Sequence, residues 1–221
     1  MSNSPLVSYT RISPNKSSPR NHKIDTITVH CVVGQLSVET IGNIFADPSK
    51  QASSNYAVGA DGRIGMYVEE ADRSWCSSNR ENDNRAITIE TACDRTAPYA
   101  VNDTAYAALI ELLTDICKRN GIPKLLWSAD PTAIGRPDIQ NMTAHRWFAA
   151  TECPGDWLYE KMSVIANEVN AKLGATPVKP EAGVLFRVQL GAFRHRENAE
   201  RLRDELKGKG YNDAFIVKGS E

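Results

Sequence analysis

Hydrophobic and polar residues alternate along several short segments in the first half of the chain, a pattern typical of β-strands. The clearest examples are residues 25–30 and 85–91, where β-branched side chains alternate with other types. Residues 54–70 hold two more strand-like runs on either side of Asp61-Gly62, a dipeptide that favours the tight turn of a hairpin. These segments predict a β-sheet.

Helical periodicity appears in three other segments. Residues 37–47 read as a short helix that Ser37 caps, and a longer amphipathic stretch begins near Asp103 and ends before Gly121. A last helix is predicted for residues 157–173. Together the segments predict an α/β fold with a mixed central sheet and helices packed on its faces, preceded by a loop of about 23 residues that wraps the domain.

A Pro-, Ala- and Gly-rich stretch then separates a second unit. We predict a catalytic domain over residues 1–173, a linker over 174–183 and a small C-terminal unit over 184–221. Within that unit a strand begins at Val184, a helix carries Ala199, Leu202 and Leu206, and a second strand covers residues 214–217. One βαβ unit of this length cannot bury much apolar surface alone, so it reads as half of a larger module.

Composition narrows the classes of partner. Hydrophobic residues make up 41% of the chain and charged residues 24%, and 26 basic residues nearly balance 27 acidic ones. This balance predicts no general attraction to nucleic acid or to an anionic membrane. No apolar run reaches the length of a membrane span, and the polar N-terminus lacks the apolar core of a secretory signal. We therefore expect synthesis in the cytoplasm and, if the protein acts outside the cell, release or export by something other than a standard signal.

Five cysteines at irregular spacing argue against a disulfide framework and leave buried thiols or metal ligands. His30 ends a strand, while His145 and Cys153 lie eight positions apart, just before a Pro-Gly turn. Two imidazoles and one thiolate would leave one position of a tetrahedral zinc ion open, which is the catalytic arrangement. From the residues alone, a packing histidine and a buried structural cysteine remain open alternatives.

Four segments in this order, ITVH, SSNYAVGADGRIGMYV, NDNRAITIE and TAHRWFAATECPGDWL, resemble the type 2 N-acetylmuramoyl-L-alanine amidases. These zinc enzymes, related to peptidoglycan recognition proteins, cut the amide bond between muramic acid and L-alanine. The resemblance covers roughly residues 20–173.

The resemblance implies a Zn²⁺ ion held by His30, His145 and Cys153. It also implies that Glu90 exchanges protons with the attacking water and that Tyr56 stabilises the oxyanion. Without the resemblance, Glu90 would read as a solvated edge residue and Tyr56 as a packing aromatic.

Two positions depart from the family pattern. Thr151 stands where many members have a lysine that steadies the intermediate, so it brings a hydroxyl without a positive charge. Cys76 stands where many members have a histidine, and we expect it to line the cleft without binding metal. Cys31 and Cys117 are expected in the core.

The C-terminal unit resembles the first half of a SPOR domain, a peptidoglycan-binding module of about twice this length. The VQLGAF and NAERLRDEL segments carry the match. Three alternatives stay open: the chain is truncated, the half-module pairs with that of a second copy in a homodimer, or the unit is a poorly ordered tail. If the unit binds glycan, Gln189, Phe193 and Arg194 are the groups expected to do so. The leading hypothesis is a zinc amidase that lyses cell walls, as an endolysin or an autolysin. The alternatives are a non-catalytic peptidoglycan-binding protein on the same scaffold and a structural zinc domain, which would need a fourth protein ligand.

Overall fold

The computed structural model describes residues 2–174, 190–209, 211 and 214–218. The chain divides into two compact units, Met1–Pro177 and Val178–Glu221. Most of the predicted linker, the predicted strand that begins at Val184, and Gln189 lie outside the described residues.

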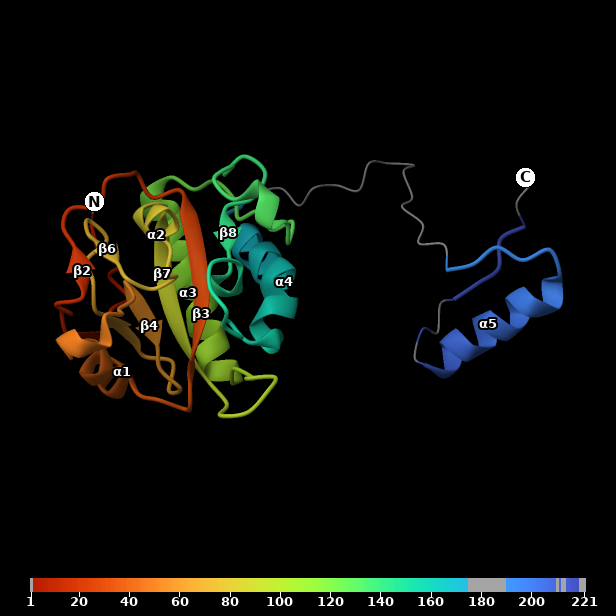
Figure 1. Cartoon of the computed structure of the whole chain (residues 1–221), viewed down its shortest axis with the longest axis horizontal. Coiled ribbons are helices and arrows are strands. Elements are labelled where there is room, and N and C mark those ends of the chain that lie inside the picture. Colours follow the sequence, from red (N-terminus) through yellow and green to blue (C-terminus); the bar gives the residue numbers. More distant parts are fainter. Residues whose placement is uncertain (1, 175–189, 210, 212–213, 219–221) are drawn as a thin grey trace. The chain divides into compact units, whose positions relative to one another are not determined.

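A six-stranded mixed sheet forms the centre of the larger unit (Figure 1). Only the β4–β5 pair is antiparallel, while the other neighbouring strands run parallel. In order across the sheet, the strands are β1 (Tyr9–Thr10), β5 (Ile64–Met66), β4 (Tyr56–Val58), β7 (Ala86–Cys93), β3 (Thr26–Val33) and β8 (Met142–Thr143). The predicted mixed sheet is therefore confirmed, and the β4–β5 hairpin turns at Gly62, whose positive φ of 80° suits glycine.

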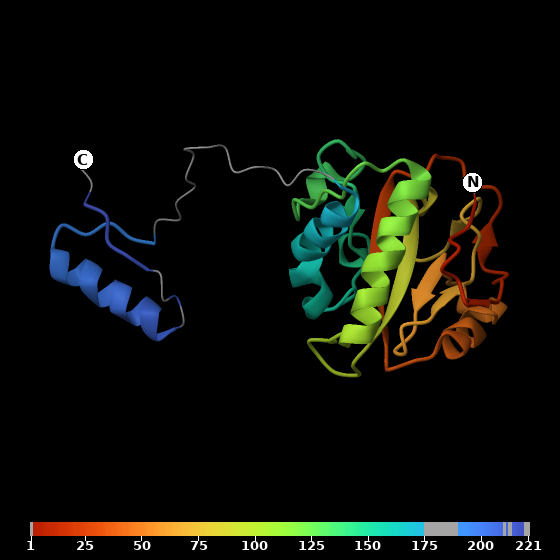
Figure 2. The ribbon, with the colours of Figure 1, turned by 180° about the vertical axis from the view of Figure 1, so that it is seen from behind.

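The predicted long helices form close to their expected bounds. Helix α1 (Val38–Phe45) is capped by Ser37, and α3 (Asp103–Asn120) ends at Gly121, which has a positive φ. The last helix of this unit is α4 (Asp156–Lys172). Figure 2 shows α3 and α4 side by side on one face of the sheet, where the main apolar core lies.

Several short elements were not predicted from the sequence. The N-terminal segment, expected as a loop, contributes β1 to the sheet and pairs β2 (Lys16–Ser17) with β6 (Arg73–Ser74). A six-residue helix, α2 (Arg80–Arg85), precedes β7. Short 3₁₀ turns cover Pro48–Lys50, Pro131–Ala133 and His145–Trp147.

Strand β3 is buried on both of its faces, not on one as its alternation suggests. Ile27 and Val29 enter the core under α3, while Thr28 and His30 on the opposite face are also fully buried. Asn82 of α2 explains this, because its amide donates to the Thr28 hydroxyl, which lies 2.8 Å from the hydroxyl of Thr143. Around Thr28 the second face of the sheet is therefore polar and hydrogen-bonded, whereas α1 covers a smaller apolar cluster on that face that includes Ile41 and Ala57.

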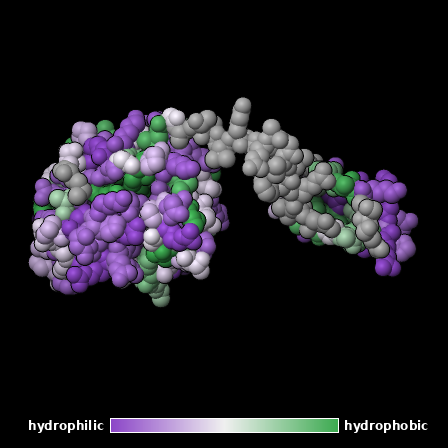
Figure 3. Space-filling model, turned by 90° about the horizontal axis from the view of Figure 1, so that it is seen from above, coloured by the Kyte–Doolittle hydropathy of each residue, from purple (hydrophilic) through white to green (hydrophobic). Residues whose placement is uncertain are grey.

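In the smaller unit the structure describes one helix, α5 (Arg196–Gly208). The predicted strand at residues 214–217 is not assigned as a strand. A strand requires a hydrogen-bonded neighbour, and the segment expected to pair with it is not among the described residues. None of the helices in the described part of the chain has the length and apolar character needed to cross a membrane. Figure 3 shows mostly hydrophilic side chains, with small apolar areas between them, on one face of the larger unit.

Candidate metal centre

His30 and Glu90 lie side by side on the polar face of the sheet. The parallel register pairs His30 of β3 with Glu90 of β7, and paired residues of neighbouring strands point to the same face. At Glu90 strand β7 lies between β3 and β4, and at His30 strand β3 is paired with β7, so the two residues are held in register by the β3–β7 ladder. The sheet therefore sets the spacing of an imidazole and a carboxylate.

His145 and Cys153 reach the same place through the loop between β8 and α4. The loop is closed by the backbone amide of Arg146, which donates to the Cys153 carbonyl at 3.1 Å. The Arg146 guanidinium donates to the Glu152 carbonyl at 2.5 Å and to the Asp156 carboxylate at 3.1 Å. The segment from His145 to Cys153 is thus a loop that folds back on itself, so that both side chains point toward His30.

The three predicted ligands come together. Ring nitrogens of His30 and His145 and the sulfur of Cys153 all lie within 4.8 Å of one another. His30 Nδ1 is 3.4 Å from Cys153 Sγ, and the centroids of the two imidazoles are 5.1 Å apart. Such separations are those of donors that can share one ion.

The protonation of this group suits a metal. Burial, with a smaller contribution from His145, lowers the pKa of His30 to about 3, and burial also lowers the pKa of His145. Both imidazoles are therefore neutral near pH 7 and can each offer a nitrogen lone pair. Two neutral imidazoles and one sulfur form a donor set that fits zinc.

Glu90 lies inside the fold with few partners. Its Oε2 is buried without a hydrogen bond, and its Oε1 faces the thiol of Cys76 at 3.8 Å. Burial raises the pKa of Glu90 to about 7, although the Cys76 contact acts in the opposite direction. A carboxyl group with such a pKa can both accept and release a proton near neutral pH.

Tyr56 does not join this group, which corrects the sequence expectation. The register pairs Tyr56 with Ile89, and Ala57 with Glu90, so the tyrosine points to the opposite face of the sheet. Its ring is fully buried in the core, and its hydroxyl donates to Glu70 Oε1 at 2.7 Å and accepts from the Ser4 amide. The structure gives Tyr56 the packing role that its residue type alone suggested.

Thr151 lies in the loop that carries Cys153 and is exposed. Its hydroxyl accepts a hydrogen bond from the Cys153 backbone amide at 3.2 Å. This contact fixes the turn that leads into the cysteine, and the residue brings no charge to the group. Electrostatic help of the kind a lysine would give is absent at this position.

Sequence reasoning missed the residues that support the group. Arg146 closes the ligand loop, and the Ser78 hydroxyl lies 3.4 Å from His145 Nε2. Cys31, expected in the core, packs against it, and its thiol lies near that of Cys153 without belonging to the donor set. Cys117 is fully buried, as expected. Adjacency in sequence could have identified Arg146, whereas Ser78 is near His145 only in the folded chain.

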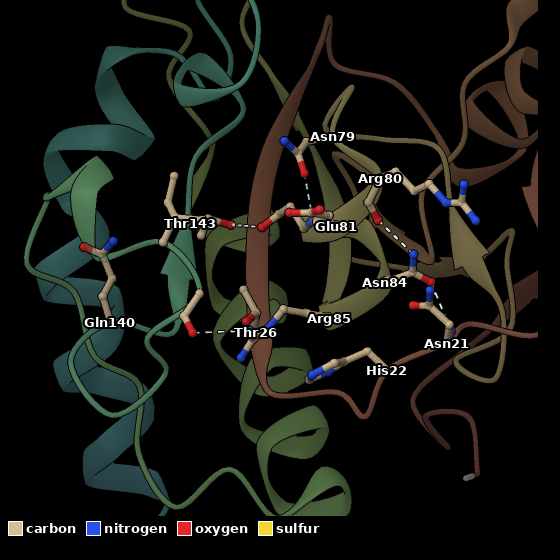
Figure 4. Close-up of a pocket in the computed structure, with 13 residues that line it drawn as sticks. Asn21, His22, Thr26, Asn79, Arg80, Glu81, Asn84, Arg85, Gln140 and Thr143 are labelled. Atoms are coloured by element: carbon tan, nitrogen blue, oxygen red, sulfur yellow. Dashed lines mark hydrogen bonds between the residues drawn. The ribbon is translucent and has the colours of Figure 1, made fainter.

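A pocket of about 540 Å³ opens on the same face of the sheet (Figure 4). Thr26 lies four residues before His30 on β3, so both side chains point to the same face. Thr26 lines the pocket together with polar side chains from α2 and from residues in and next to β8. The labelled members include Asn79, Arg80, Asn84, Arg85, Gln140 and Thr143. None of its lining residues belongs to the metal group, so the pocket lies beside that group and does not contain it.

Comparison with known proteins supports this geometry. The sequence profile of the N-acetylmuramoyl-L-alanine amidase family matches residues 20–156, and that of the SPOR domain matches residues 166–220. Searching curated protein sequences finds no match to the chain.

Solved structures of similar fold include PlyL, at 13% identity and a TM-score of 0.54, with 73% of this chain and 95% of that chain covered. A selenomethionine derivative of AmpD has 18% identity and a TM-score of 0.53, with 74% and 96% covered. The N-acetylmuramoyl-L-alanine amidase LysC from Clostridium intestinale has 20% identity and a TM-score of 0.50, with 77% and 96% covered. Identities this low establish a shared fold.

The amidase profile spans more than half of the chain and includes β3, β7 and the whole ligand loop up to Asp156. The protein therefore belongs to the N-acetylmuramoyl-L-alanine amidase family and is an enzyme of peptidoglycan hydrolysis.

Proposed function

We propose that the amidase reaction depends on a zinc ion held by His30, His145 and Cys153. The observation that carries this proposal is the convergence of these three donors beside a carboxylate that lacks partners. Zinc bound by three protein ligands polarises a carbonyl and lowers the pKa of water. The chain contributes the rest of the chemistry through the groups around the donors.

In this proposal Glu90 moves the proton. Its Oε2 has no competing hydrogen bond, so it can accept a proton from the attacking water. The same oxygen can then donate that proton to the leaving amine of L-alanine, because a carboxyl group whose pKa is near 7 is easily protonated and deprotonated. Thr151 positions Cys153 through the backbone, and Tyr56 takes no part in the reaction.

The same reading assigns the biological role and the parts of the chain. We propose that residues 1–173 cleave the lactyl amide and that the protein lyses cell walls as an endolysin or an autolysin. Residues 184–221 would hold the enzyme on peptidoglycan, and their pairing with a second copy would complete the half-module. Exposed apolar side chains in the described part of that unit support a binding or pairing surface; they are Leu190, Phe193, Tyr211, Phe215, Ile216 and Val217.

Removal and return of metal test the catalytic proposal. Chelation should abolish the release of free L-alanine amino termini from a soluble muropeptide, and added Zn²⁺ should restore it. Cys153→Ala should lose both zinc and activity, whereas Cys31→Ala, which removes a neighbouring thiol outside the donor set, should keep both. Full activity in folded, zinc-free protein would refute the proposal.

The binding role of the C-terminal unit has its own test. A chain that ends at residue 183 should sediment less with insoluble cell walls while it cleaves the soluble muropeptide at the wild-type rate. Sedimentation equilibrium of both forms reports pairing, which only the full chain should show. Equal wall binding by both forms would remove the role proposed for residues 184–221.

A further inference from the structure

A second group of donors lies beside the first. His30, Cys76 and Glu90 each offer one ligand atom, and these atoms lie within 4.8 Å of one another. Cys76 follows β6 and belongs to neither the metal group proposed above nor the ligand loop. The two groups have only His30 in common, so they define two adjacent positions on the same face of the sheet.

Two polar atoms of this second group are buried without partners. Neither His30 Nε2 nor Glu90 Oε2 makes a hydrogen bond. Leaving a buried polar atom unsatisfied costs free energy, so a group bound at this site would supply the partner that each of these atoms lacks. The third member, the Cys76 thiol, contacts the other carboxylate oxygen at 3.8 Å.

The position of Cys76 is fixed by the surrounding fold. The Asp83 carboxylate accepts from the backbone amides of Cys76 and Ser77, at 3.1 and 3.2 Å, and from the Ser77 hydroxyl at 2.6 Å. Asp83 is itself held in α2 and almost fully buried. The thiol is thus held against Glu90, and the residue as a whole is half-buried.

We propose that Cys76 and Glu90, with His30 at their side, form a second site for a soft divalent cation such as Zn²⁺ or Cd²⁺. Thiolate sulfur selects soft and borderline cations over Mg²⁺ and Ca²⁺, and the carboxylate adds negative charge. The sequence pattern pointed to Cys76 as a wall residue, so the donor role revises that expectation. This inference rests on the proposed function for the identity of the first site.

Sharing His30 makes the second site weaker than the first. A neutral imidazole has one lone pair, so His30 cannot serve two ions unless it loses its remaining proton. An ion at the second site is therefore held mainly by Cys76 and Glu90. Because Glu90 is the proposed proton acceptor, an ion bound there would block proton transfer, and excess zinc should inhibit the enzyme.

Titration of the metal-free full chain with Cd²⁺ tests the site, since each cadmium–thiolate bond adds charge-transfer absorbance in the ultraviolet. Wild type should show two steps. The second step should disappear in Cys76→Ala and in Cys76→Ser, a near-isosteric variant that retains a hydrogen-bond donor but is a poor ligand for soft cations. Thermal melts confirm that each variant is folded.

Cys31→Ala is the matched control, because Cys31 is a thiol close to Cys153 and outside the second group. It should keep both steps. Two steps in the folded Cys76 variants, or loss of the second step in Cys31→Ala, would overturn the inference. The first step depends on Cys153 and reports the proposed function separately, so Cys153→Ala distinguishes failure of one proposal from failure of the other.

Activity gives an independent readout of the same site. In wild type the rate of muropeptide cleavage should be severalfold lower in excess Zn²⁺ than at one equivalent of Zn²⁺. In Cys76→Ser the two rates should be nearly equal. An equal fall in both proteins would place the inhibitory ion elsewhere and overturn the inference.

Discussion

Glu70 and Glu90 both place a carboxylate inside the fold, but they differ in the number and strength of the hydrogen bonds that their oxygens accept. Glu70 is fully buried, and its oxygens accept from the Tyr56 hydroxyl at 2.7 Å, from Arg119 at 2.6 Å and from the Asn120 amide at 2.9 Å. Every strong interaction that the carboxylate can make is therefore in place. Such a group stabilises the fold and has no capacity left for chemistry.

Glu90 presents the opposite case on the other face of the sheet. One oxygen has a weak thiol donor, and the other has no partner. Burial without compensation raises the pKa of Glu90. The contrast shows that hydrogen bonding to the carboxylate, more than burial, separates a structural glutamate from one that can serve the proposed proton transfer.

Replacing Glu70, the fully hydrogen-bonded glutamate, should have the largest effect on the free energy of unfolding. Glu70→Gln removes the charge that faces Arg119, whose remaining partners are the Asp115 carboxylate and the Ser2 carbonyl, and we expect a loss of about 4 kcal/mol. Urea unfolding measures the loss. Cleavage per folded molecule should stay near wild type, and a selective loss of turnover would contradict the structural role of Glu70.

Glu90→Gln should stabilise the metal-free protein at high pH. The folded-state pKa of about 7 lies above the ordinary value of 4.5, so wild-type stability falls as pH rises through this interval and stays low above it. A neutral glutamine avoids this cost, and we expect a gain of about 2–3 kcal/mol at pH 8. The gain should vanish below pH 4.5, where glutamate is protonated in both states. Thermal melts at both pH values test the sign.

Tyr56→Phe should have a smaller structural effect and little catalytic effect. The change removes the donor to Glu70 and the acceptor for the Ser4 amide but keeps the buried ring, so we expect a loss of about 1–2 kcal/mol. The kcat for a soluble muropeptide should not change. A large fall in kcat with the fold intact would return Tyr56 to the reaction.

Thr151→Ala should have the smallest effect. It removes one exposed hydrogen bond to the Cys153 amide, and we expect kcat to fall by no more than about threefold, since such a bond contributes about 0.5 kcal/mol. Steady-state kinetics on zinc-loaded protein provide the measurement. A fall of two orders of magnitude would show that the Thr151 hydroxyl acts on the substrate.

The sequence was most informative where local pattern and motif coincide. The alternation of residues 25–30 and 85–91, the Asp61-Gly62 turn and the periodicity after Asp103 predicted β3, β7, the hairpin and α3. The four family-like segments predicted His30, His145 and Cys153 as ligands, and the fold brings their ligand atoms within 4.8 Å of one another. Their roles as ligands stay a prediction.

The sequence could not reveal which residues share a face across strands. Tyr56 and Glu90 both belong to matching segments, yet a register that pairs Tyr56 with Ile89 separates them onto opposite faces. The contact between Cys76 and Glu90 likewise depends on α2 and Asp83, whose short helix has too few residues for a periodic signal. Register and long-range hydrogen bonds decide these contacts.

Turnover of zinc-loaded Glu90→Gln, measured on a soluble muropeptide with the zinc content of the same sample, tests the central claim most directly. Glutamine keeps the size of the side chain but cannot accept the proton, so kcat should fall by about 10²–10⁴-fold while one zinc per chain is retained. Wild-type turnover in that folded, zinc-loaded variant would contradict the account.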